Sequence, residues 1–272
     1  MGTALRTEYR KLVTTRMWWV LLVVMALYMA FLAAVLAFSL TLEGGGGGGF
    51  TGTPQATPLS PEELARTIYT LATSLGYVFP VIVGALAMTG EFRHQTITPT
   101  LLAEPRRSVV LAAKMLSSIV VGLVFGVVGT LATVGAGAAT LALRGEATGL
   151  TEPIVLRSAG LSVLALTVWT VVGVGFGALI TNQVAVIVVL LAFTQFVEPV
   201  LRIVLAQLDW AAGVSKFLPG AAGESITGAS FYAGTGMGAD LLGSGQGLAV
   251  LLGYALMFAV LGRLLALRRD IT

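Results

Sequence analysis

Few residues in this chain could do chemistry, and their types favour ionic contacts over covalent catalysis. The 272-residue sequence contains one histidine, His94, and no cysteine. Cysteine nucleophiles, thiolate metal sites and disulfides are therefore excluded. A membrane hydrolase would need a nucleophile and a base that converge, but no Gly-x-Ser-x-Gly elbow occurs in the sequence. We therefore expect no catalytic residues and no metal site, and the chain alone is not expected to be an enzyme.

His94 belongs to the longest polar stretch in the first half of the chain, residues 90–107. Its charged side chains are Glu91, Arg93, Glu104, Arg106 and Arg107. Burying five such charges in lipid would cost roughly 10 kcal/mol or more. We therefore expect the whole stretch to lie in water or at a headgroup surface.

A second ionic feature lies in an otherwise apolar segment, where Glu198 and Arg202 stand four residues apart around Pro199. On a helix this spacing places the two side chains on one face. Charges inside a membrane span favour a role in substrate contact or gating. The alternative is an ion pair that meets water at the outer end of a span, where Pro199 breaks the helix.

Polar and aromatic residues on two spans extend this candidate substrate path. Such residues line a path in some membrane proteins, and in others they pack against neighbouring helices. The residues assigned to the path are Tyr69, Thr73, Tyr77, Phe79, Gln195, Glu198 and Arg202.

The composition places these residues in an integral membrane protein. The chain is 56% hydrophobic and 11% charged, whereas soluble domains average about 25% charged residues. A net charge of +3 is too dilute for a nucleic-acid footprint. The glycine run 44–49 is not followed by Gly-Lys-Ser/Thr, so it predicts a flexible loop and not a phosphate loop.

Apolar runs predict an all-α fold that forms one transmembrane domain, residues 1–272. The predicted spans are residues 17–40, 64–89, 109–140, 157–180, 184–207 and 247–265. The first run is too long for the apolar part of a signal peptide and predicts a retained anchor. Ser60-Pro-Glu-Glu predicts a helix start, and Thr181-Asn-Gln predicts the turn between spans four and five.

The segments between and before the spans differ in character. Residues 1–16 predict an interfacial amphipathic helix, or simply a basic flank that orients the first span. Residues 209–245 predict short external helices that lie in or dip into the membrane face. Lys114 is expected to reach the interface from the start of span three, and Gly122 with Gly126 favours close helix contact.

The basic residues are distributed unequally between the two sides of this layout. Eleven of the 16 Lys and Arg residues fall on the side that holds both termini and residues 90–107. This asymmetry predicts that both termini and the polar stretch are cytoplasmic. The glycine run and residues 209–245 then face outward.

With this topology the chain resembles the ABC-2 type transporter permeases, the transmembrane subunits of ABC exporters. The resemblance covers nearly the whole layout and includes a Gly-Glu-x-Arg-x-x-Thr-Ile segment and a Leu-Pro-Gly segment. A long glycine loop after span one departs from the family pattern, as does His94. The matching residues are Gly90, Glu91, Arg93, Thr96, Ile97, Leu101, Leu102, Pro105, Arg106, Arg107, Leu218, Pro219 and Gly220.

The resemblance implies an exporter subunit in the cell membrane that pairs with a second permease copy or a sibling. A separate cytoplasmic subunit would bind ATP and Mg²⁺, and the substrate path would run at the permease interface, which the family builds from spans one, two and five. Residues 90–107 would form the coupling helix that docks on this ATPase, beside an N-terminal elbow helix. The coupling residues would be Glu91, Phe92, Arg93, His94, Thr96, Arg106 and Arg107, and the elbow residues Arg6, Tyr9 and Arg10.

Two other functions remain open from the residues alone. A secondary transporter driven by an ion gradient would usually show buried acids near mid-membrane, and Glu198 is the one candidate. A membrane subunit that anchors an ATPase without carrying substrate would also fit. For the polar stretch itself, the alternative to a coupling helix is an ordinary solvated loop.

Overall fold

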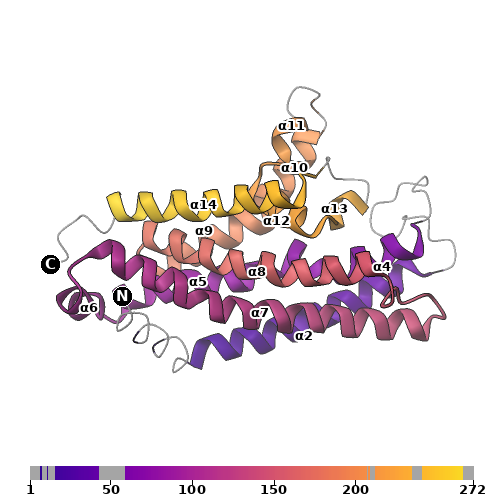
Figure 1. The fold of residues 1–272 in the computed structure, drawn as a ribbon, viewed down its shortest axis with the longest axis horizontal. Coiled ribbons are helices and arrows are strands. Elements are labelled where there is room, and N and C mark those ends of the chain that lie inside the picture. The colour runs from indigo at the N-terminus through magenta and orange to yellow at the C-terminus, as the bar shows by residue number, and fades with distance from the viewer. Residues whose placement is uncertain are drawn as a thin grey trace.

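The computed structural model describes residues 7, 11, 16–42, 59–206, 208, 212–234 and 241–265, and every regular element within these residues is a helix. Six of the helical segments are long and apolar enough to cross a membrane. Most of them lie side by side along one long axis, and the fifth turns away from this axis in its second half (Figure 1). The predicted all-α fold with six apolar helices of spanning length is therefore confirmed. The six segments are Met17–Leu40, Pro61–Arg93, Arg107–Leu143, Pro153–Leu179, Gln183–Leu205 and Ser244–Leu265.

Several of these segments are built from more than one helix. The first span is α2 (Arg16–Leu40), and the second combines α4 (Pro61–Tyr69), a π turn η1 (Ala72–Gly76) and α5 (Val78–Arg93). Spans three and four are α7 (Arg107–Leu143) and α8 (Pro153–Leu179). The fifth combines α9 (Gln183–Ala192), η2 (Phe193–Val197) and α10 (Glu198–Ala206), and the sixth is α14 (Ser244–Leu265). The short helices are α6 (Ile97–Ala103), α11 (Ala212–Ser215), α12 (Pro219–Thr227) and α13 (Phe231–Gly234).

Local sequence signals predicted the N-terminal ends of two helices correctly. Ser60 caps α4 and forms a capping box with Glu63, as the Ser-Pro-Glu-Glu pattern predicts. Asn182 accepts hydrogen bonds from the first backbone N–H groups of α9, which confirms the turn between spans four and five. Helix α7 is longer than predicted, with 37 residues or about 55 Å.

Both π turns come shortly before a proline. A proline has no N–H to offer the carbonyl four residues earlier, and this leaves one helical hydrogen bond unmade. For Pro80 that carbonyl belongs to Gly76 in η1, and for Pro199 it belongs to Gln195 in η2. Each span thus passes its proline by a local π turn and continues as a helix.

Helix α8 is the centre of the bundle, packed against α5, α7 and α14. Its contact with α5 is close because glycines stand at the crossing. A Cβ on Gly84 would lie 2.0 Å from the Thr170 carbonyl oxygen, and one on Gly173 would lie 2.1 Å from that of Val81. Gly122 and Gly126 of α7 meet α8 in the same way, which confirms the close contact predicted for them.

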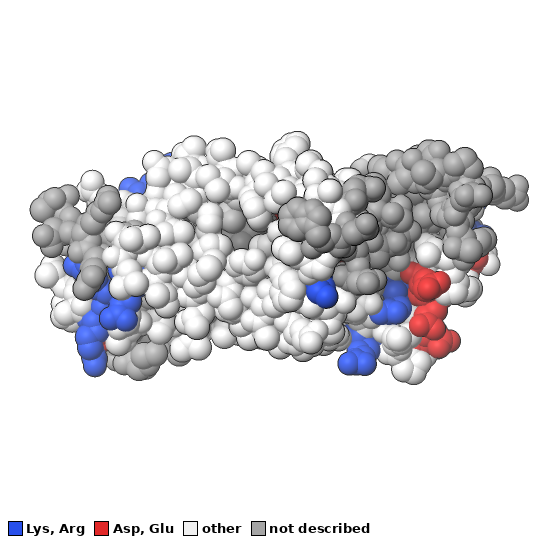
Figure 2. Space-filling view, turned by 90° about the horizontal axis from the view of Figure 1, so that it is seen from above, with Lys and Arg blue, Asp and Glu red and all other residues white. Residues whose placement is uncertain are grey.

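Charged residues gather at the two ends of the bundle. On the face shown in Figure 2, Lys, Arg, Asp and Glu lie mainly at the two ends, and the middle is almost free of charge. The start of α2, the α6 segment and the last turn of α14 lie at one end, and α4 lies at the other (Figure 1). This arrangement fits the six-span layout, with an apolar belt between two polar ends.

The predicted short helices after span five are present, but one of them is an interior element. Helix α12 packs between α8 and α14, and every residue from Gly220 to Thr227 is buried. Its neighbour Gly247 sits against the Ala222 carbonyl oxygen, where an added Cβ would lie 2.6 Å away. The chain therefore re-enters the bundle after α10 and α11, which depart from it (Figure 1).

Candidate functional site

The candidate site is the polar end of the bundle, formed by the last turns of α5, the short helix α6 and the start of α7. Helix α5 continues past the predicted span end to Arg93 and is closed by a turn in which Gln95 has a positive φ of 55°. The Thr96 N–H bonds to the Glu91 carbonyl oxygen at 2.9 Å and holds this turn tight. The stretch 90–107 is thus a helix–turn–helix hairpin and not an open loop.

Glu91 is buried, which differs from the expectation that all charges of this stretch lie in water. Its side chain is 6% exposed, and one oxygen, Oε1, accepts hydrogen bonds from Lys11 and Lys114, each at 2.7 Å. The expectation is wrong for Glu91 because these cations come from distant parts of the chain. Lys114 is also buried within the protein, since its side chain is 2% exposed and donates to the Ala87 carbonyl oxygen as well.

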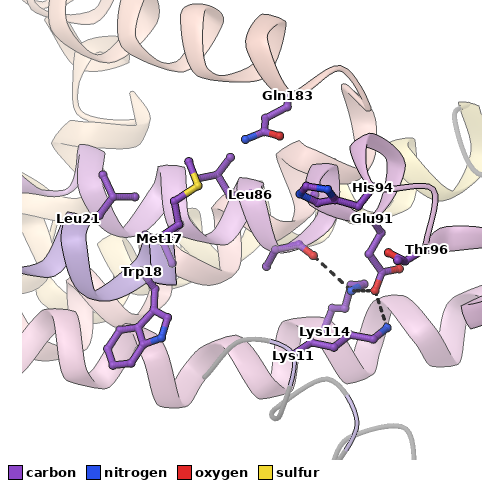
Figure 3. Close-up of a pocket in the computed structure, with 13 residues that line it drawn as sticks. Lys11, Met17, Trp18, Leu21, Leu86, Glu91, His94, Thr96, Lys114 and Gln183 are labelled. Atoms are coloured by element: carbon purple, nitrogen blue, oxygen red, sulfur yellow. Dashed lines mark hydrogen bonds and ion pairs between the residues drawn. The ribbon is translucent and has the colours of Figure 1, made fainter. Parts of the chain in front are cut away.

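This Lys11–Glu91–Lys114 cluster connects four parts of the chain. Lys11 precedes span one, Glu91 belongs to α5, and Lys114 belongs to α7. Lys11 also donates to Thr100 Oγ1 of α6 at 3.0 Å. A displacement of α6 would therefore act on α5, α7 and the segment before α2 together. Figure 3 shows the two ammonium groups meeting at the carboxylate.

The other predicted coupling residues divide into packed and exposed groups. Phe92 and Leu101 pack against a small core around Met88, Ile97 and Leu111. On the outside, His94 and Thr96 are exposed, and Arg93 is exposed and donates to Gln183 Oε1 at 3.2 Å.

The start of α7 and the free face of α6 complete this surface. Arg107 is half-buried at the start of α7. Arg106 is exposed and bonds to Glu104, and this hydrogen bond lowers the pKa of the Glu104 carboxyl. Leu102 of α6 is 79% exposed. The elbow residues Arg6, Tyr9 and Arg10 lie outside the described residues.

No protein-family model and no curated protein matches the chain. The geometry of the chain therefore carries the functional argument.

The residues predicted to line the substrate path differ in their exposure within one chain. Tyr69 and Thr73 are fully buried, and Tyr77 is 3% exposed, with its ring stacked on Trp169 at 4.4 Å between ring centres. The packing interpretation therefore describes these three residues. Phe79 and Gln195 are half-buried, and Phe79 lies 6.0 Å from the ring of Tyr28, which is exposed on α2.

Glu198 and Arg202 form the predicted i, i+4 ion pair, with 3.0 Å between Oε1 and Nη2. The pair does not meet water, because the two side chains are 1% and 8% exposed. Arg202 also donates from Nη1 to Glu224 of α12 at 2.9 Å. Sequence reasoning missed Glu224, which lies among small residues of a short helix and carries no local signal of its partner.

Helix α12 completes this second cluster. The backbone N–H groups of Gly220 and Ala221 donate to Glu198 Oε1 at 2.6 Å and 3.2 Å. The remaining oxygens, Glu198 Oε2 and Glu224 Oε1, are buried without a hydrogen-bond partner. The cluster thus contains two buried carboxylates and one guanidinium, and it attaches α12 to span five.

Proposed function

We propose that this chain is the membrane-spanning permease subunit of an ATP-driven ABC transporter, an exporter that works as a dimer. ATP would be hydrolysed on a separate cytoplasmic subunit. The observation that carries the proposal is the α5–α6 hairpin, which presents an exposed surface while its buried face is bonded through Lys11 and Lys114 to two other parts of the chain, the segment before α2 and helix α7.

The physical case rests on how a push on α6 is transmitted. Glu91, Lys11 and Lys114 are held at 2.7 Å in a largely buried contact, and separating buried charges is expensive. Helix α6, the end of α5 and the start of α7 therefore move as a unit. Rigid elements with few alternative arrangements are what a coupling device requires.

The docking surface proposed for the ATPase is the exposed side of the hairpin. It combines Leu102 as an apolar contact with Arg93, His94 and Arg106 as polar ones. Glu91 supports this surface from within and does not contact the partner. Of the coupling residues that the resemblance implies, Arg93 and not Glu91 is therefore assigned the ionic contact with the ATPase.

A photo-crosslinking amino acid at Leu102 tests the docking surface in native membranes. We expect it to capture an ATP-binding subunit. Leu143, 88% exposed at the opposite end of α7, is the matched control and should capture no such subunit. Failure of Leu102 to crosslink an ATP-binding protein in membranes where the chain is folded would contradict the proposal.

Charge reversal tests coupling apart from docking. Arg93→Glu should lower the transport obtained per ATP hydrolysed in the reconstituted complex, because it disturbs the contact and leaves the buried ions in place. Arg157→Glu, at an exposed arginine of α8 near the other end, is the control. Equal transport per ATP in the two variants would count against the coupling role.

The path would lie between permease copies. The exposed faces of α2 and of the α9–α10 span are largely apolar. Tyr28 is exposed on α2 beside the ring of Phe79, and Gln195 is half-buried in span five. We therefore propose these residues as path-lining, in place of Tyr69 and Thr73. Alanine at Gln195 should change substrate preference while assembly with the ATPase is retained.

A second candidate function is supported by the buried ions of span five. Intramembrane acids are typical of transporters driven by an ion gradient, and Glu198 and Glu224 share one arginine in the interior. Transport by the purified chain in vesicles that carry a proton or sodium gradient, without ATP, would support this alternative. Transport that requires ATP and the partner would exclude it.

A further inference from the structure

A pocket of about 390 Å³ lies beside the Lys11–Glu91–Lys114 cluster, between the start of α2, the end of α5 and the start of α9 (Figure 3). This volume falls within the range of small-ligand sites, about 300–1,000 Å³. Coupling of the hairpin to α5 and α7 makes no use of this space. Binding of a ligand in this pocket, as inferred from its walls, needs the chain to lie in a bilayer and does not depend on an ATPase partner.

One part of the pocket wall is apolar and lies at the edge of the membrane span. Trp18 and Leu21 from α2 line it, together with Val83 and Leu86 from α5. Trp18 is the third residue of α2, a position where tryptophan is enriched because its ring suits the boundary between hydrocarbon and headgroups. A ligand in contact with this wall would be in contact with the outer part of the lipid chains.

The other part of the wall is polar and carries a positive balance. The described ionisable groups there are Lys11, Lys114 and Glu91, which sum to a formal charge of +1, together with His94. Lys11 is the ion that a ligand can reach, because its side chain is 38% exposed, against 2% for Lys114. Gln183 accepts from Arg93 through its carbonyl oxygen, so it can offer its amide group to an anion.

An apolar wall at membrane depth next to a cationic polar end selects an amphiphile with an anionic head. We propose that the pocket binds one phospholipid of the surrounding leaflet whose headgroup carries a net negative charge. The phosphate lies against Lys11 and the Gln183 amide. The upper methylenes of one chain lie against Trp18 and Leu86, and the rest of the lipid extends into the bilayer.

Trp18 and Trp19 give a direct measurement of this site. Trp18 lines the pocket, whereas its neighbour Trp19 is 50% exposed on α2 and does not. The chain is reconstituted in vesicles in which either phosphatidylglycerol or phosphatidylcholine carries brominated chains, which quench nearby tryptophan fluorescence. The contribution of each residue is the difference between wild type and Trp18→Phe or Trp19→Phe.

We expect bromine on phosphatidylglycerol to quench Trp18 with about fivefold selectivity over phosphatidylcholine, the preference that one accessible lysine confers. High salt should reduce the selectivity. Trp19 should show much weaker selectivity. Equal quenching of Trp18 by the two lipids, measured as the difference between wild type and folded Trp18→Phe, would overturn the proposal.

Filling the pocket provides the second test. Gly90 lines it, and a Cβ added there meets no atom within 4 Å, so Gly90→Phe should abolish the Trp18 selectivity without a clash at the backbone. Gly253→Phe on α14 has the same open surroundings and is the control. Selectivity that survives in folded Gly90→Phe would overturn the proposal. Loss of selectivity on addition of inorganic phosphate at constant ionic strength would show a site for the free anion and would overturn the lipid assignment.

Discussion

Replacing Arg202 by methionine should strongly destabilise the protein. Among the described residues, Arg202 is the one cation between the buried carboxylates of Glu198 and Glu224, and its guanidinium bonds to both. Methionine fills a similar volume but leaves two negative charges in the interior. Breaking a buried ion pair by removing one partner typically costs about 3–5 kcal/mol.

The magnitude can be checked by unfolding the purified chain in mixed micelles with increasing denaturing detergent. We expect Arg202→Met to lower the free energy of unfolding by about 4 kcal/mol. Arg202→Lys should lie between wild type and Arg202→Met, because one ammonium cannot reproduce a fork that uses Nε, Nη1 and Nη2 on two carboxylates.

One further variant separates the effect of charge from the effect of packing. The triple variant Glu198→Gln, Arg202→Met, Glu224→Gln removes all three charges, so it should recover most of the stability lost in Arg202→Met. The reasoning is refuted if Arg202→Met unfolds like wild type. It is also refuted if the triple variant is no more stable than Arg202→Met, because packing and not charge would then explain the loss.

Three further changes test the bundle and the polar end. Gly84→Ala should lower the melting temperature, because the new methyl group would lie 2.0 Å from the Thr170 carbonyl oxygen, whereas Gly253→Ala, with open space around it, should raise stability slightly. Lys114→Met should lower the free energy of unfolding by about 3 kcal/mol in the same assay, since it removes a buried cation from Glu91. Unfolding at the wild-type free energy would contradict a stabilising role of the Lys11–Glu91–Lys114 cluster. Ser60→Ala should lower the free energy of unfolding by about 1 kcal/mol and speed hydrogen exchange in the first turn of α4 alone. Unchanged exchange in that turn would contradict the role of Ser60 as an N-cap.

Features set by neighbouring residues in the sequence were predictable. Each apolar run is long enough to imply a span by itself, and the cap at Ser60 needs only Pro61 and Glu63 beside it. The turn at Asn182 follows because one helix of the combined length would exceed the membrane. The ion pair of Glu198 and Arg202 also follows from spacing on one helix.

Features set by distant residues were not predictable from one sequence. Glu91 belongs to a stretch that is mostly polar, and its burial depends on Lys11 and Lys114, which lie 80 and 23 positions away. Glu224 joins Arg202 only because α12 folds back into the bundle. Local hydropathy cannot reveal such pairings, because the cost of burying each charge is offset by a partner elsewhere in the chain.

The residues predicted to line the substrate path also depend on distant parts of the chain. Tyr69 and Thr73 are polar residues on a spanning helix, a pattern typical both of a path and of packing between helices. In the bundle they face the central helices, and Tyr69 bonds to the Thr148 carbonyl oxygen. Which face of a helix meets its neighbours depends on the whole bundle, so one span alone cannot separate the two interpretations.

The central claim is that an ATP-binding subunit works through the hairpin of α5 and α6. The most direct measurement is to purify the tagged chain from its native membrane in mild detergent and quantify the proteins that remain bound. We predict an ATP-binding subunit in one-to-one ratio with this chain. It should be lost when Leu102 is replaced by glutamate and retained when Leu143 is replaced by glutamate. Recovery of the folded chain without any ATP-binding subunit would contradict the claim.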